Sequence, residues 1–172
     1  MHLKTRRLTI EDEPIFHALI NSVEENLECK EYWEHINDDE RKLLITNPDI
    51  IMLGIFDKDI LVATAGLSCY SGHVTDVAAR LGISDAVGII GRVMTLPEYR
   101  GNGLASALIR DIISESSILR LGAVISYVHP SNTESCKMFI SNDFDVQACA
   151  FMENDSLRYI YIRKVGVRYD KT

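Results

Sequence analysis

The sequence predicts an α/β or α+β fold in which helices flank one mixed β-sheet. Strand-like apolar runs alternate with helix-periodic runs along the chain, and a strand–turn–helix unit lies at its centre. No repeat, low-complexity tract or Pro/Gly-rich linker divides the 172 residues. We therefore expect residues 1–172 to form a single domain.

The N-terminal half is predicted to contain three strands and two helices. Leu3 to Ile10 is strand-like, and Glu11-Asp12-Glu13-Pro14 then places acids and a proline where a helix begins. A second helix is predicted over about Glu31 to Ile45. Ile50 to Phe56 and Ile60 to Ser68 form a hairpin around a polar turn. The first helix has apolar residues at helical spacing: Ile15, Phe16, Leu19, Ile20, Val23 and Leu27.

The C-terminal half begins with a polar connection over residues 71–86, which has one predicted helical turn around Val77 to Leu81. A short helix is expected after His129-Pro130-Ser131-Asn132, ending near Asn142, and the last hairpin turns near Glu153-Asn154-Asp155. The other predicted elements are strands at Val87 to Thr95, Ala123 to Val128, Val146 to Met152 and Leu157 to Val165, and a helix from Leu104 to Ile113.

Composition excludes several classes of protein. Hydrophobic residues make up 47% and charged residues 25%, which is typical of a globular chain. The net charge of −7 argues against nucleic acid as a partner. No run approaches the roughly 18 apolar residues of a membrane span, and no signal peptide is visible, so we expect a cytoplasmic protein with no membrane partner. Four distant cysteines argue against a zinc site or a disulfide framework: Cys29, Cys69, Cys136 and Cys149.

The most informative segment is the turn Arg100-Gly101-Asn102-Gly103-Leu104-Ala105, between a predicted strand and a predicted helix. A strand that passes through glycines into a helix leaves backbone N–H groups unpaired, and the helix dipole adds positive potential. The turn therefore predicts an anion site, and with it a ligand that carries phosphate.

Two common phosphate-binding motifs do not match this turn. A dinucleotide fingerprint needs a third glycine after Gly101-x-Gly103, where the chain has Ala105 and Ser106. A Walker loop needs Gly-Lys-Ser/Thr, which is absent. The context of the turn, Val93-x-Thr95-x-Pro97 before it and an apolar helix after it, is more specific.

With that context, the segment resembles the acetyl-CoA signature of the GCN5-related N-acetyltransferases (GNATs), Arg/Gln-x-x-Gly-x-Gly/Ala, at Arg100, Gly103 and Ala105. A second segment, Asn132-x-x-Ser135-x-x-x-Phe139-x-x-x-x-Phe144, is similar to the family's Asn-x-x-Ala…Tyr…Gly-Phe segment. The element order agrees over about residues 3–165. The resemblance implies a mostly antiparallel sheet of about six to seven strands with about four helices.

The resemblance also implies roles for individual residues. Acetyl-CoA would be the co-substrate, and the strand end at Val93, Met94 and Thr95 would pair its backbone with the pantetheine arm. Backbone amides over Arg100, Gly101, Asn102, Gly103, Leu104, Ala105 and Ser106 would hold the pyrophosphate. Asn132 would hydrogen-bond the pantetheine arm, and it also fits as the N-cap of the following helix.

The chain departs from the family at two positions. Phe139 stands where a tyrosine commonly protonates the departing thiolate, and Asp143 replaces the usual glycine. Asp143 and its neighbour Asn142 tolerate a left-handed helix end better than most residues. Loss of the acid matters less than loss of a base: a thiol has a pKa of about 8.5, whereas deprotonating an amine of pKa about 10.4 at pH 7.4 costs about 4 kcal/mol.

The sequence does not identify the general base. Some relatives carry a glutamate within the strand at residues 87–92, and others a carboxylate at the position of Tyr127; neither is present. Tyr127 is predicted as the acid or as a substrate contact, or alternatively as a core residue. Four loop residues could act through water: His73, His129, Asp76 and Asp85.

Residues 11–40 are strongly acidic, and the family's first two helices line the acceptor entrance. This indicates a small cationic amine as acceptor, although a solvated helix face also explains such charges. Only Lys30 is basic there, and Tyr32, Trp33 and His35 could close over a substrate. The eleven acids are Glu11, Asp12, Glu13, Glu24, Glu25, Glu28, Glu31, Glu34, Asp38, Asp39 and Glu40.

Together these features predict an acyltransferase that moves an acetyl group from acetyl-CoA to a small-molecule primary amine. No metal is expected. The alternatives are a protein or peptide N-acetyltransferase and a non-catalytic CoA-binding sensor module. The acyl-chain preference and the oligomeric state are open, with a homodimer as one option.

Overall fold

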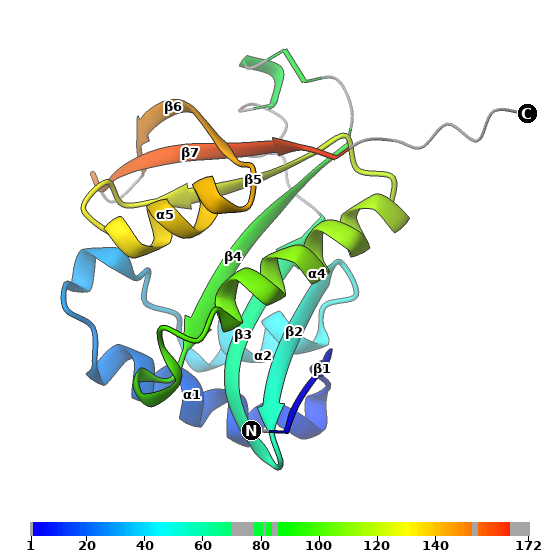
Figure 1. Cartoon of the computed structure of the whole chain (residues 1–172), viewed down its shortest axis with the longest axis vertical. Helices are drawn as coiled ribbons and strands as arrows, with labels where there is room; N and C mark the ends of the chain where they lie inside the picture. The colour runs from blue at the N-terminus through cyan, green and yellow to red at the C-terminus, as the bar shows by residue number, and fades with distance from the viewer. Residues whose placement is uncertain (1, 70–77, 81, 84–85, 153–154, 166–172) are drawn as a thin grey trace, which may run out of the picture.

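The structure, a computed structural model, describes residues 2–69, 78–80, 82–83, 86–152 and 155–165. Within these residues one seven-stranded sheet has the order β1-β2-β3-β4-β5-β7-β6 (Figure 1). The β4–β5 pair is parallel, and the other neighbouring strands are antiparallel. This mixed, mostly antiparallel sheet flanked by helices confirms the predicted fold class.

The N-terminal strand, β1 (Leu3–Arg7), is shorter than the predicted Leu3 to Ile10, because a carboxylate turns the chain. Asp12 accepts hydrogen bonds from the Thr9 backbone N–H at 2.8 Å and from Arg6 Nη1 at 2.7 Å. The Arg6 guanidinium lowers the pKa of Asp12 to about 2. A 3₁₀ turn (Ile10–Asp12) then leads into α1 (Glu13–Glu25).

The second helix, α2, covers Asp38–Thr46 rather than the predicted Glu31 to Ile45. Its start is set by a capping box: the Asn37 side chain accepts from the Glu40 N–H at 3.0 Å, and Glu40 accepts from the Asn37 N–H at 2.8 Å. Residues 26–37, here called the α1–α2 segment, therefore connect the two helices with only a 3₁₀ turn at Lys30–Tyr32.

The remaining elements agree with the prediction to within about a residue at each end, except that α4 continues past the predicted end at Ile113 to Ile118. Residues 78–80 are helical, as expected around Val77 to Leu81, and most of the predicted connection lies outside the described residues, as does much of the turn at Glu153-Asn154-Asp155. The elements are β2 (Ile50–Asp57), β3 (Ile60–Ser68), β4 (Val87–Thr95), α4 (Leu104–Ile118), β5 (Ala123–Val128), α5 (Thr133–Ser141), β6 (Asp145–Phe151) and β7 (Leu157–Lys164).

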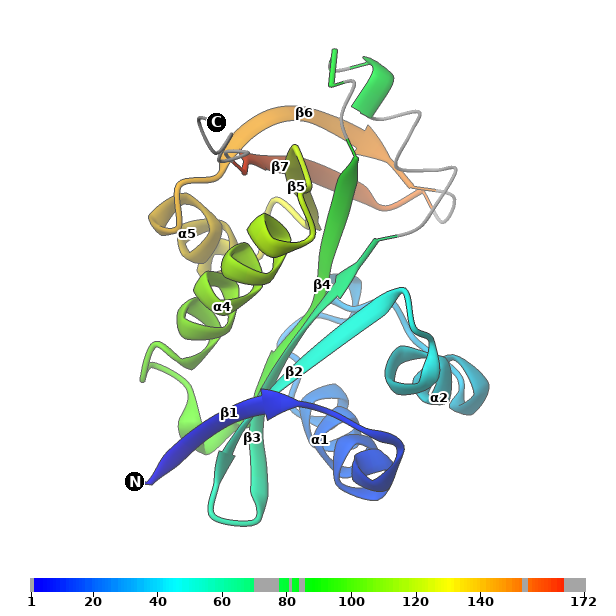
Figure 2. The same cartoon turned by 90° about the vertical axis from the view of Figure 1, so that its right-hand side faces the viewer.

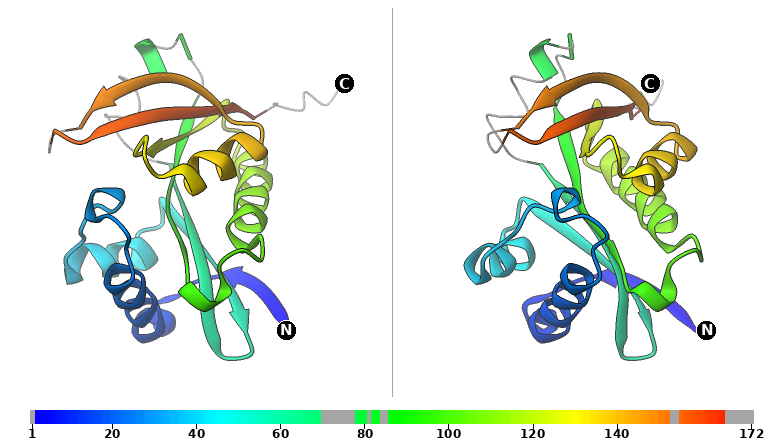
Figure 3. Two further views of the ribbon diagram at one scale, coloured as in Figure 1. Left: turned by 60° about the vertical axis from the view of Figure 1, so that its left-hand side comes forward. Right: turned by 90° about the vertical axis from the view of Figure 1, so that its left-hand side faces the viewer.

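Helices cover both faces of the sheet (Figure 2), with α1 and α2 on one side and α4 and α5 on the other. Phe16 and Ile20 of α1 are fully buried in one hydrophobic cluster, and Leu108, Ile109 and Ile112 of α4 in a second. Figure 3 shows the α1–α2 segment and the β6–β7 hairpin on the same side of the molecule. Among the described residues, no helix is long and apolar enough to cross a bilayer.

Candidate active site

The centre of the sheet opens between β4 and β5. These parallel strands are in register at Val87↔Ala123, Gly88↔Val124 and Ile89↔Ile125, and no pairing continues beyond Ile89. A cleft of about 540 Å³ lies at the opening, lined by Ile89 to Val93 of β4 and by Ser126 to His129 at the end of β5. Because the β5-facing edge of β4 has no strand partner there, its backbone can pair with an extended, amide-bearing ligand.

A β-bulge in β4 lies at this opening. Thr64 pairs with Met94 and Gly66 with Gly91, so Arg92 and Val93 oppose a single residue of β3. Arg92 has a φ of 53°, and its carbonyl accepts from Thr64 Oγ1 at 3.2 Å. The bulge bends the strand and aims the Arg92 side chain into the cleft, which that residue lines.

The three predicted pantetheine contacts on β4 occupy different environments. Val93 lines the cleft. The Met94 side chain is buried in the cluster formed with α1, so any contact from Met94 must come from its backbone. Thr95 pairs with Ala63 of β3, and its carbonyl accepts from Arg100 Nε at 3.4 Å.

The predicted phosphate turn has the backbone that an anion site requires. Gly101 and Gly103 have φ values of 78° and 73°, in the left-handed region that favours glycine, and a Cβ at either position would meet open space. Asn102 Nδ2 donates to the Tyr99 carbonyl at 3.0 Å and so closes the turn. The turn itself lies outside the residues lining the cleft and is joined to β4 through Arg100 and Thr95.

The N–H groups of this turn point to no acceptor in the described part of the chain. The first backbone N–H of α4 with an acceptor belongs to Ala107, which donates to the Gly103 carbonyl at 3.0 Å. From Gly101 to Ser106, therefore, the described structure contains no partner for the backbone N–H groups. Ser106 is fixed from its side chain, because its Oγ accepts at 3.2 Å from Nδ2 of Asn142, the C-cap of α5.

Asn132 has the N-cap role predicted for it, and its contact with the pantetheine arm stays a prediction. As the N-cap of α5, its Oδ1 accepts from the Ser135 N–H at 3.1 Å, and it also lines the cleft. No acceptor for its Nδ2 is found among the described residues. The cap fixes the side-chain amide and leaves its donor end for a ligand carbonyl.

Two tyrosines line the cleft within the described chain, and their hydroxyl groups differ. The Tyr32 hydroxyl donates to the Ser131 carbonyl at 2.7 Å. The Tyr127 hydroxyl has no partner among the described residues, and burial raises its pKa above the usual 10. Phe139 packs edge-on against Phe144 and stacks on Tyr161, so it serves the core and offers no hydroxyl. Tyr127 thus combines a lining position in the cleft with packing against a buried cluster of β4, β5 and β7, as both alternatives for it foresaw.

Of the four loop residues predicted to act through water, His129 lies in the cleft, and His73, Asp76 and Asp85 lie outside the described residues. His129 Nε2 is 3.3 Å from Glu31 Oε2, and Nδ1 accepts from the Ser131 N–H at 3.2 Å. Both ring nitrogens are thus engaged, which leaves no free lone pair for a substrate proton.

The eleven acids of residues 11–40 are dispersed. Glu34 lines the cleft, and Glu31 lines an adjoining pocket of about 490 Å³ beside the β6–β7 turn. Asp12 pairs with Arg6 at 2.6 Å, and Glu24 accepts from Trp33 Nε1 at 2.7 Å. Most of the others face solvent, as the alternative interpretation of the charge run held.

Sequence analysis missed two arginines of the cleft, Arg92 of β4 and Arg158 of β7. Arg92 is the single charged residue of the run Val87 to Thr95, and a lone charge in an apolar strand is a signal that could have identified it. Arg158 gives no such signal, because Arg163 and Lys164 follow in the same strand.

Comparison with known proteins agrees with this geometry. The family model described as FR47-like protein matches residues 66–151, which is half of the chain. No curated protein sequence matches significantly. Many solved structures share the fold.

An N-acetyltransferase from Staphylococcus aureus superposes with a TM-score of 0.75 at 15% identity, covering 96% of this chain and 99% of that one. The PaiA N-acetyltransferase from Thermoplasma acidophilum, in complex with coenzyme A, gives 0.70 at 19%, covering 95% and 99%. A GNAT-family acetyltransferase from Streptococcus pneumoniae gives 0.73 at 15%, covering 96% and 100%. The chain belongs to the FR47-like family and has the fold of the GNAT superfamily.

Proposed function

We propose that this protein transfers an acetyl group from acetyl-CoA directly to a small-molecule primary amine. The observation that carries the proposal is the presence of two unpaired backbone surfaces along one strand–turn–helix unit, the split edge of β4 and the N–H groups of Gly101 to Ser106. A ligand that fits both has phosphate at one end and an amide-containing arm at the other. Coenzyme A has this chemistry, and the acyl group would lie in the cleft.

Each part of the donor would meet a different part of the protein. The pyrophosphate accepts hydrogen bonds at the start of α4, where the helix dipole adds to the attraction. The pantetheine arm pairs with β4 beyond Ile89, and Asn132 Nδ2 donates to one of its carbonyls. Backbone N–H groups near Val93 to Thr95 would polarise the thioester carbonyl.

The reaction forms one N–C bond and breaks one C–S bond. A neutral amine attacks the thioester carbonyl, the CoA sulfur leaves as thiolate, and the nitrogen releases a proton to water. Tyr127 would protonate the sulfur, since its hydroxyl has no other partner among the described residues and stays protonated at neutral pH. Holding both substrates in one cleft would supply most of the rate enhancement.

The acceptor would enter between the α1–α2 segment and the β6–β7 hairpin. The two pockets share Trp33, His129 and Arg158, so the cleft is continuous with the space between these elements. Glu31 and Glu34 lie along this route and would attract the ammonium form of the amine. The other acids of residues 11–40 would not contribute to this attraction, because most of them face solvent elsewhere.

The donor site is tested by Gly103→Trp, with Gly82→Trp as a matched control. Both glycines have positive φ and open space around an added Cβ, so the backbone strain is similar. Only Gly103 lies in the proposed phosphate turn. We expect Gly103→Trp to weaken acetyl-CoA binding at least 100-fold by calorimetry and Gly82→Trp to leave it within twofold. Equal affinities in the two variants would contradict the assignment.

Acetyl transfer itself is tested by thiol release from acetyl-CoA with polyamines, amino acids and peptides. We expect release with small amines. Release with peptides alone would identify a protein acetyltransferase. Tight CoA binding with no release for any amine would identify a sensor module instead.

A further inference from the structure

The acceptor side of the cleft contains more cationic than anionic side chains. Arg92 of β4 and Arg158 of β7 line it, and among the described residues Glu34 is the single lining carboxylate. A cleft built only to attract cations would not contain two guanidinium groups. The arginines therefore require a separate explanation.

Arg158 has a structural explanation. It is 8% exposed, and its Nη2 donates to the Glu31 carbonyl at 2.8 Å. Its Nη1 donates to the Leu157 carbonyl at 3.2 Å and to Ser156 Oγ. These bonds hold the α1–α2 segment against β7 and occupy both terminal nitrogens.

Arg92 is only partly explained in the same way. Its Nη1 donates to the Glu34 carbonyl at 2.8 Å, but Nη2 lies 3.9 Å from Glu34 Oε2, beyond hydrogen-bond distance. No acceptor for Nη2 or Nε is found in the described chain. The Arg92 side chain is 21% exposed, whereas the Glu34 carboxylate is 73% exposed and therefore a weak partner. Burial lowers the pKa of Arg92, and the carboxylates of Glu34, Glu40 and Glu24 offset that burial only in part.

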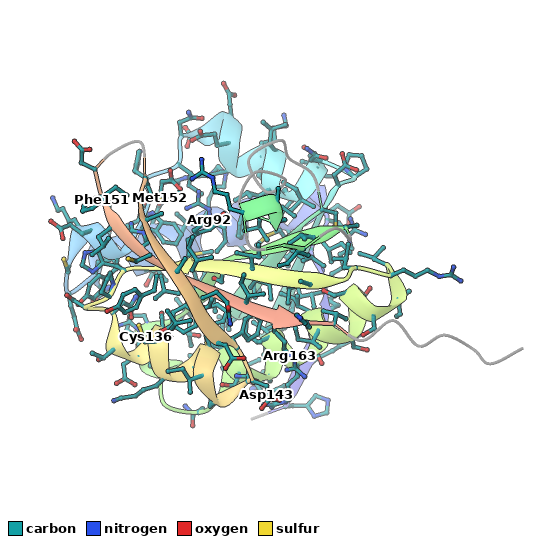
Figure 4. The ribbon with its side chains drawn as sticks, turned by 90° about the horizontal axis from the view of Figure 1, so that it is seen from above. Arg92, Cys136, Asp143, Phe151, Met152 and Arg163 are labelled. Carbon is teal, nitrogen blue, oxygen red and sulfur yellow. The ribbon has the colours of Figure 1, made fainter. Side chains whose placement is uncertain are left out.

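The guanidinium group is also held in one orientation. Its carbon lies 5.1 Å from the centre of the Trp33 ring, and the bulge fixes its backbone. Figure 4 shows the side chain directed from β4 toward the α1–α2 segment, where Glu34 accepts its hydrogen bond. A planar fork with two free donor nitrogens matches the geometry of a carboxylate.

We propose that Arg92 binds a carboxylate group of the acceptor, so that the substrate is a small amino-acid-like zwitterion. Its amine faces the thioester beside Val93, the residue that follows Arg92, while its carboxylate pairs with Nη2 and Nε. The incoming carboxylate supplies the compensation that Glu34 provides poorly. The cleft of about 540 Å³ must also hold the thioester end of the donor, which favours a small acceptor over a peptide. This inference rests on the proposed acetyl transfer.

The test compares amino acids with their carboxamides, which share the amine and lack the negative charge. We expect wild-type kcat/KM to favour the amino acids by at least tenfold. Arg92→Met should reduce that preference to below threefold, and Arg92→Lys, which keeps the charge but loses the fork, should give an intermediate value. Arg110→Met, an exposed arginine of α4 outside both pockets, should keep the wild-type preference.

A second measurement does not depend on turnover. Calorimetry with CoA-bound protein should show N-acetyl amino acids binding at least tenfold more tightly than N-acetyl amino acid amides, and Arg92→Met should remove the difference. Turnover of amino acids and amides at equal rates would overturn the carboxylate inference and leave acetyl transfer standing. Turnover that is confined to peptides and unaffected by Arg92→Met would have the same two consequences. Arg92-dependent carboxylate binding without turnover of any amine would support the site and overturn the proposed reaction.

Discussion

The donor side and the acceptor side of the cleft are constructed differently. The donor side, from β4 through the glycine turn to α4, offers backbone groups whose direction is set by φ angles at Gly101 and Gly103. The acceptor side consists of side chains, and hydrogen bonds from Arg92 and Arg158 hold the α1–α2 segment over it. Backbone recognition depends on a short contiguous motif, whereas side-chain recognition depends on contacts between residues far apart in the chain.

We expect Arg158→Met to change the acceptor side most, in both stability and amine binding, because it releases the α1–α2 segment from β7. The substitution would leave the Glu31 carbonyl without its charged donor, and the free energy of unfolding should fall by about 1–3 kcal/mol. The KM for the amine should rise about tenfold, because the acceptor wall loses its support, while the affinity for acetyl-CoA stays within twofold. Urea unfolding, calorimetry and initial rates measure the three quantities.

Arg120→Met is the control for this change, since Arg120 is exposed at the end of α4 and outside both pockets. It should leave the amine KM and the stability within experimental error. A parallel loss of acetyl-CoA affinity in Arg158→Met would show that the two sides of the cleft are not independent.

A more local effect, confined to kcat, is expected from Tyr127→Phe, at the boundary of the two sides. Without the hydroxyl, CoA must leave as an unprotonated thiolate, and kcat at pH 7 should fall about 10-fold to 100-fold. The deficit should shrink above a pH of about 8.5, where the thiolate is stable in water. Burial raises the pKa of Tyr127 above 10, so the wild-type hydroxyl stays mostly protonated up to pH 10. Titration of this hydroxyl should therefore cause no loss of rate below pH 10.

The pH profile of kcat measures both effects, with Tyr159→Phe as control. Tyr159 is on β7, opposite Val128 and Cys149, and lines neither pocket. A pH-independent deficit in Tyr127→Phe would indicate a role in substrate packing instead of proton transfer.

The same contrast explains how far the sequence predicted the structure. The fold class and the glycine turn between β4 and α4 were foreseen because strand and helix periodicity and the Gly101-x-Gly103 pattern are local signals. The start of α2 was placed too early, although the capping box at Asn37 and Glu40 is visible in the sequence. The contacts of Arg158 with Glu31 span 127 residues, and no local pattern encodes them.

The smallest expected effect concerns Asp143, where the chain departs from the family's glycine. Asp143 has a φ of 61° and ends α5 in the left-handed region, which costs a non-glycine residue about 1 kcal/mol. Its carboxylate is 85% exposed and lies 3.7 Å from Arg163 Nη2 at the molecular surface (Figure 4). An exposed ion pair of this kind contributes little to stability. Arg163 keeps its 2.7 Å hydrogen bond to the Asn142 carbonyl without it.

Asp143→Gly should therefore raise the free energy of unfolding by about 0.5–1 kcal/mol, the relief of strain being partly offset by the greater freedom of glycine in the unfolded chain. Asp143→Ala removes the same carboxylate but keeps the strain, so it should be less stable than Asp143→Gly by about 1 kcal/mol. Chemical denaturation of the three proteins measures this difference. If the alanine and glycine variants were equally stable, the left-handed backbone would carry no cost, and the aspartate would be retained for its charge alone.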